Sequence, residues 1–67
     1  MRVSLERTIL TVTPCGGAWA VEQDGTLFGH SPDKEVAKAN AHKRAVEIVQ
    51  SGGGAQVLIH GEGWRFR

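Results

Sequence analysis

Four side chains of this sequence could hold a metal ion or act as nucleophiles: His30, His42, His60 and Cys15. Zinc sites present their ligands in short pairs, such as two cysteines separated by two residues, and no such pair occurs here. His30 and His60 each end a predicted strand and would approach one another only if those strands were neighbours. No helix N-terminus or adjacent histidine is expected to activate Cys15. We therefore expect no metal and no other cofactor. An enzyme that uses Cys15 or His60 is the last alternative.

Basic side chains occur on the predicted helix and again at the end of the sequence, where they alternate with aromatic residues. They are Lys38, Lys43, Arg44, Arg65 and Arg67. Such cations can follow a phosphate backbone, and aromatic rings beside them can stack on bases. Acidic residues interleave with the helical cations, however, as in surface ion pairs such as Lys43 with Glu47. Nucleic-acid binding is therefore the alternative function, and a formal net charge of +1 does not argue for it by itself.

Length limits the fold, because 67 residues form one domain with a small core. Chains of this size usually need a disulfide, a metal or oligomerisation as a supplement. Cys15 is the single cysteine, so an internal disulfide is excluded and self-association is the expected supplement. The charged start and the lack of a long apolar segment predict a cytoplasmic protein without a membrane contact.

Turn residues divide the first half of the sequence into three predicted strands, at residues 3–13, 18–22 and 26–30. We expect Pro14 to end the first strand, because proline has no N–H to donate to a neighbouring strand. The Asp24-Gly25 pair tolerates positive φ and predicts a tight hairpin between the second and third strands. Trp19 and Val21 share one face of the second strand and are expected in the core.

A helix is predicted to follow, with Ser31 as its N-cap and Pro32 at its first position. It should extend to about Gln50 and end at Gly52. Small apolar residues at helical spacing form its expected buried stripe: Ala37, Ala41, Ala45, Ile48 and Val49. Because this stripe is mostly alanine, the helix can approach a sheet closely. Residues 55–60 and 64–67 read as two further strands.

The order of these elements is β-β-β-α-β-β, which predicts an α+β fold. We expect a single domain over residues 1–67, with its core from about residue 8. It should contain a small, twisted, largely antiparallel sheet with one helix packed on one face. One helix covers only one sheet face, yet several strands carry apolar residues on both faces. A second copy of the chain would cover the rest, so we expect a homodimer. Its interface is expected to include Val57, Leu58, Ile59, Trp64 and Phe66.

Several of these segments together resemble a known family. They are Thr11–Pro14, Gly17–Val21, the alanine-spaced helix and Gly54–Gly61, and they resemble the small bacterial domains of domain-of-unknown-function family 2188. The resemblance covers roughly residues 8 to 67. The sequence departs from it in the polar segment Ser31–Lys38 and in Trp64. The family has no established function, so the resemblance implies a fold. Similar bacterial domains pair two units with exchange of C-terminal strands, which implies a homodimer here. A non-enzymatic binding or interaction module is the expected function.

Overall fold

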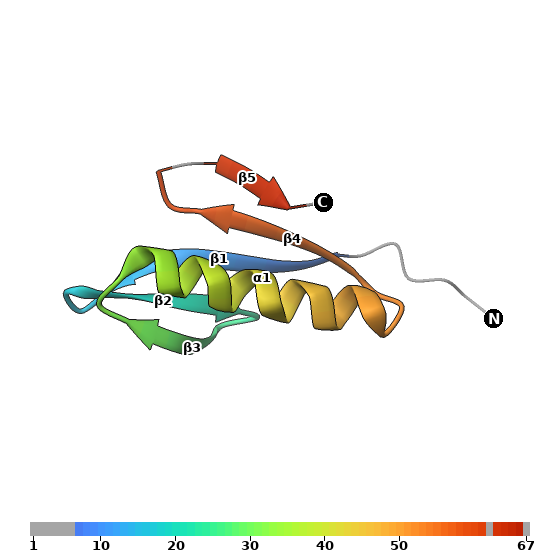
Figure 1. Cartoon of the computed structure of the whole chain (residues 1–67), viewed down its shortest axis with the longest axis horizontal. Helices are drawn as coiled ribbons and strands as arrows, with labels where there is room; N and C mark the ends of the chain where they lie inside the picture. Colours follow the sequence, from blue (N-terminus) through green and yellow to red (C-terminus); the bar gives the residue numbers. More distant parts are fainter. Residues whose placement is uncertain (1–6, 62, 67) are drawn as a thin grey trace.

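In a computed structural model, the described residues fold into one sheet and one helix (Figure 1). The structure describes residues 7–61 and 63–66, the last four by their backbone alone. In chain order the elements are β1 (Arg7–Cys15), β2 (Ala18–Gln23), β3 (Thr26–Ser31), α1 (Lys34–Gln50), β4 (Gly54–Ile59) and β5 (Gly63–Phe66). This order confirms the predicted α+β fold. The part of the first strand that was expected before Arg7 lies outside the described residues.

The sheet places the first strand of the chain at its centre. The strand order is β3-β2-β1-β4-β5. β1 and β4 are parallel, whereas the other neighbouring strands are antiparallel, so the sheet is largely antiparallel as predicted. Asp24 and Gly25 have φ angles of 53° and 83° and form the predicted tight turn between β2 and β3. α1 then returns the chain across one face of the sheet and brings β4 alongside β1 (Figure 1).

Pro14 does not end the first strand, so that prediction is wrong: β1 continues through Pro14 to Cys15. On one side of β1, Pro14 lies opposite Trp19 of β2. On the other side, the carbonyl of Val12 accepts a hydrogen bond from the N–H of His60 (2.9 Å), where β4 has ended. Alternate residues of a strand turn their backbone polar groups to the same neighbour. The nitrogen of Pro14 therefore faces the space beyond β4, where its missing N–H costs no hydrogen bond.

A β-bulge interrupts the pairing of β2 with β3. Val21 pairs with Phe28 and Trp19 pairs with Ser31, so β3 contains one residue more than β2 between these pairs. Gly29 lies in this bulge with a φ of 66°. A Cβ atom at this position would lie 3.0 Å from the side-chain nitrogen of Asn40 on α1. Glycine is therefore favoured here both by its backbone conformation and by the close approach of the helix.

The helix begins two residues later than predicted, because Ser31 belongs to β3 and pairs with Trp19. The N-cap is Asp33, whose carboxylate accepts a hydrogen bond from the N–H of Glu35 (2.9 Å). The buried Ser31 hydroxyl accepts a bond from the N–H of Asp33 (3.0 Å). Serine therefore stabilises the segment that leads into the helix, and aspartate caps the helix itself.

The helix ends as predicted. Its C-cap is Ser51, and Gly52 has a φ of 99°. The N–H of Gly53 donates to the carbonyl of Ile48 (2.9 Å), and the N–H of Gly52 donates to the carbonyl of Val49 (3.0 Å). These two bonds define a Schellman motif, which satisfies carbonyl groups that the helix leaves unpaired at its end. The motif lets the chain turn directly from α1 into β4.

Three alanines of the helix form its contact with the sheet. Ala37, Ala41 and Ala45 are fully buried. They pack on the side chains that the three central strands turn toward α1, which are Leu10, Val12, Val21, Val57 and Ile59, each at most 1% exposed. Ile48 packs beside this core, whereas Val49 is exposed, so its predicted place in the buried stripe is wrong. Alanine contributes little volume but allows close packing, and the strands supply the larger apolar side chains.

Candidate binding surface

The face of the sheet opposite α1 retains apolar side chains. Strand alternation turns Ile9 to this face, because its neighbour Leu10 is buried beneath the helix. The register places Leu58 opposite Thr11, and it places Leu27 opposite Glu22, which itself pairs with Thr11. Ile9 is 37% exposed and Leu27 is 43% exposed. Threonine, glutamate and glutamine side chains separate these residues, so the helix-free face is mixed rather than continuously apolar.

The residues expected at a dimer interface are divided between the two faces of β4. Val57 and Ile59 are fully buried under α1, where they belong to the core of this chain. Leu58 lies on the helix-free face and is half-buried. The register pairs the backbone of β5 with β4 at Trp64 and Phe66, whose side chains lie outside the described part of the structure. Of the three described side chains, only Leu58 is thus available on the helix-free face.

The basic residues of the alternative hypothesis do not gather at one place. Lys38 donates to Glu35 (3.2 Å), and only 17% of its side chain is exposed. Lys43 and Arg44 lie on α1 beside β3. Arg65 belongs to β5, at the opposite edge of the sheet from β3, and Arg67 lies outside the described residues. The sheet therefore separates Lys43 and Arg44 from the strand that carries Arg65.

A hollow lies between α1 and the edge strand β3. Its volume is about 320 Å³, and it is lined by Phe28, Gly29, Asn40, Lys43, Arg44 and Glu47. A second hollow, of about 290 Å³, adjoins Phe28 and reaches the β2–β3 turn. Arg44 donates from Nε to Gln23 Oε1 (3.1 Å) and from Nη1 to Glu47 Oε1 (3.2 Å). Glu47 thus pairs with Arg44 rather than with Lys43, which has no hydrogen bond or ion pair within the described part of the chain.

Sequence reasoning missed this hollow because its walls come from segments far apart in the chain. Phe28 was assigned only to a strand, and Asn40 was not singled out. One feature of the sequence could have indicated the hollow. Asn40 is a polar residue beside the alanine stripe by which the helix contacts the sheet. Its side-chain nitrogen donates to the carbonyl of Gly29 (3.2 Å). This bond fixes the distance between α1 and the edge of the sheet.

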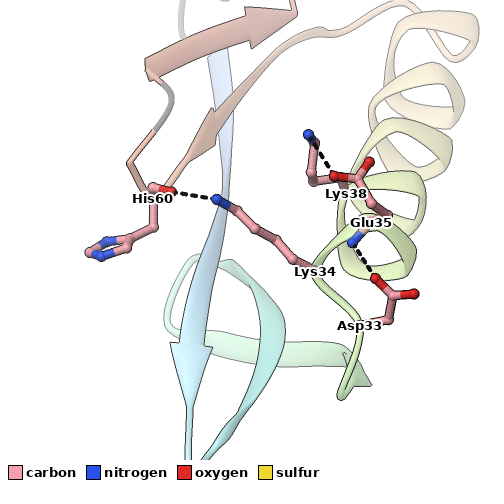
Figure 2. Close-up of polar contacts among 5 residues, drawn as sticks. All are labelled: Asp33, Lys34, Glu35, Lys38 and His60. Atoms are coloured by element: carbon pink, nitrogen blue, oxygen red, sulfur yellow. Dashed lines mark hydrogen bonds and ion pairs between the residues drawn. The ribbon is translucent and has the colours of Figure 1, made fainter.

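A lysine at the start of α1 anchors the helix to the end of β4. Lys34 Nζ donates to the carbonyl oxygen of His60 (3.1 Å), as Figure 2 shows. The same ammonium group lies 4.9 Å from the centroid of the Trp19 ring. The rings of Trp19 and His60 are also neighbours, with centroids 6.3 Å apart. The cation therefore joins α1, β2 and the β4–β5 turn at one end of the sheet.

Replacing Lys34 with methionine should lower the free energy of unfolding by about 1–2 kcal/mol. Methionine keeps most of the apolar stem but removes both the donor to His60 and the charge over Trp19. Urea denaturation followed by circular dichroism measures the change. Lys34→Arg retains the cation and its donors, so it should keep most of the stability. Equal losses in the two variants would contradict this account of the anchor.

The two histidines at strand ends are not on neighbouring strands. β3 and β4 are separated by β2 and β1, so His30 and His60 do not end neighbouring strands. Cys15 is half-buried at the end of β1, opposite Ala18. Within residues 7–61 and 63–66, no three histidine, cysteine, aspartate or glutamate side chains form a group that could hold a metal ion. Nor is α1, in the same described part of the chain, long and apolar enough to cross a membrane.

Comparisons of the chain with family models, with curated proteins and with solved structures find no match. The resemblance to family 2188 therefore stays a prediction.

Proposed function

We propose that the protein is a non-enzymatic binding module of the bacterial cytoplasm that works as a homodimer. The observation that carries this proposal is the exposure of single apolar side chains on the sheet face that the helix leaves uncovered. Ile9 and Leu27 are each more than one-third exposed on the helix-free side of the sheet. The free thiol of Cys15 and the resemblance to a bacterial family support the cytoplasmic location.

Small size strengthens the argument for a second copy. A folded chain of 67 residues buries only about 60% of the surface that its unfolded chain exposes. Each apolar side chain left in water thus removes a relatively large part of the available stabilisation. Dimerisation would cover Ile9 or Leu27 and would add the missing apolar contact without a metal or a disulfide.

The core positions of Val57 and Ile59 restrict the form of this dimer. A simple association of two folded copies can use Leu58 but not its two neighbours, which the helix covers. Val57 and Ile59 would enter an interface only if the C-terminal strands were exchanged between copies, as the resemblance implies. We favour association of folded copies, because it leaves the core of each chain in place.

Light scattering at micromolar concentration should give the mass of two chains for the wild-type protein. The double variant Ile9→Thr/Leu27→Thr should shift this mass toward one chain, because it removes two exposed apolar side chains from the described part of the sheet and retains residues that favour strands. The matched control is Val36→Thr/Val46→Thr, which removes exposed apolar groups from the outer side of α1. The control should remain dimeric. A wild-type protein with the mass of one chain at all concentrations would refute the homodimer.

A further inference from the structure

In the regularly paired part of β3, Thr26 to Phe28, one residue has backbone polar groups that face outward. The carbonyl of Val12 faces β4, since it accepts a hydrogen bond from His60. Val12 and its partner Val21 are therefore a non-hydrogen-bonded pair, and Val21 turns its polar groups to Phe28 on β3. By the same alternation, Leu27 turns its N–H and C=O away from β2. Among the described residues, no strand flanks β3 on that side.

A turn and a bulge bound the regularly paired part of this edge. On one side of Leu27, the chain enters the tight turn at Asp24 and Gly25. On the other side, the bulge at Gly29 breaks the regular pairing, and the carbonyl of Gly29 accepts a bond from Asn40. Bulges and covered carbonyls are devices by which sheets prevent the addition of further strands. What remains is a short open segment, Thr26 to Phe28, with Leu27 at its centre.

Pairing with the same segment of a second copy, across a two-fold axis, suits this segment better than pairing with a separate peptide strand. In an antiparallel hydrogen-bonded pair, two facing residues exchange both of their N–H···O=C bonds. With a two-fold axis at Leu27, the two facing residues are Leu27 of each copy. One residue with open backbone groups in each copy is therefore enough to form both hydrogen bonds. The exposed Leu27 side chains would then lie against each other on the helix-free face, where both become covered.

Charges beside β3 agree with the same axis. Lys43 and Glu47 both line the hollow between α1 and β3, and both are exposed. Arg44 lies between them on α1 and bonds Gln23, whose partner Thr26 precedes Leu27, so this part of the helix lies beside the open segment. A two-fold axis at Leu27 would turn the two helices antiparallel to each other. Lys43 of one copy would then lie toward Glu47 of the other, while Arg44 keeps its bond to Glu47 of its own copy.

We propose that two copies of this chain associate edge to edge along β3, antiparallel, with the two-fold axis at Leu27. This inference rests on the proposed homodimer and specifies its interface. The sheets join into one continuous sheet, and the hollows beside Phe28 in the two copies face each other. The interface is isologous, so it closes after two copies.

Covalent trapping tests the interface directly. Leu27→Cys is introduced in a Cys15→Ser background, so that the new thiol is the single one in the chain. Residues that face each other in a hydrogen-bonded pair have Cα atoms about 5.5 Å apart, which is within the range for a disulfide. Mild oxidation at micromolar concentration should therefore convert this variant to a covalent dimer. Val46→Cys in the same background is equally exposed but lies on the outer side of α1, and it should remain a monomer on a non-reducing gel.

Light scattering of three single variants separates the proposals. Leu27→Lys should raise the dimer dissociation constant at least about tenfold, because two lysines would face each other across the axis. Ile9→Lys and Leu58→Lys change the same sheet face away from β3 and should leave the constant unchanged. A dimer that survives Leu27→Lys but is lost in either of the other two keeps the homodimer and overturns the β3 interface. A wild-type monomer overturns both.

Discussion

Replacing Ile59 with alanine should lower the free energy of unfolding by about 2–5 kcal/mol. Ile59 is 1% exposed and lies in the core beneath α1. Truncation removes buried apolar surface and leaves a cavity that close-packed neighbours fill only in part. A domain of this length has a total stability of about 3–10 kcal/mol, so the variant should be partly or wholly unfolded. Urea denaturation monitored by circular dichroism measures the loss.

The neighbouring residue provides the matched control. Leu58→Ala removes a similar side chain from the same strand, but on the helix-free face, where it is half-buried. We expect it to cost clearly less than the change at Ile59. The comparison also distinguishes a core residue from an interface residue, because the sequence predicted Ile59 at a dimer interface. Similar losses in the two variants would show that the two faces of β4 are equally covered, contrary to the fold described above.

Enlarging Ala41 to leucine should destabilise the protein by about 1–3 kcal/mol or more. Ala41 is fully buried at the centre of the helical stripe that touches the sheet. Extra methyl groups at this position would force α1 away from the strands, because little space is available in a close-packed contact. The shift would also strain the bond from Asn40 to Gly29 on the same helix. Thermal and urea unfolding give the magnitude.

Ala39→Leu is the control for this second prediction. Ala39 lies on the same helix, but it is exposed. Leucine and alanine both favour helices, and surface substitutions usually change stability by less than about 0.5 kcal/mol. A large loss at Ala39, or no loss at Ala41, would contradict the position of α1 on the sheet.

Local signals predicted those parts of the fold that short segments determine. The Asp24-Gly25 turn and the helix end at Gly52 depend on residues that tolerate positive φ, and both are found as predicted. The start of the helix was wrong because Ser31 and Asp33 are both good N-cap residues. Pairing of Ser31 with Trp19 on another strand decides between them, and sequence spacing does not contain that information.

Features that depend on neighbouring strands were not predictable in the same way. Whether Pro14 can remain within a strand depends on where β4 ends, more than 40 residues later in the chain. The bulge at Gly29 depends on the approach of Asn40 from α1. The apolar character of β4 was recognised, but alternation alone does not tell which of its faces the helix covers. The hollow beside Phe28 forms only where α1 packs beside β3, so no single segment of the sequence indicates it.

The bulge at Gly29 also limits how fibres could grow from this edge of the sheet. Fibre growth requires a sheet edge with unpaired backbone N–H and C=O groups along its whole length. Each added strand then exposes a new edge of the same kind. The outer edge of β3 offers a single such residue between a turn and a bulge. Gly29 and the amide of Asn40 thereby leave little of this edge open to a further strand.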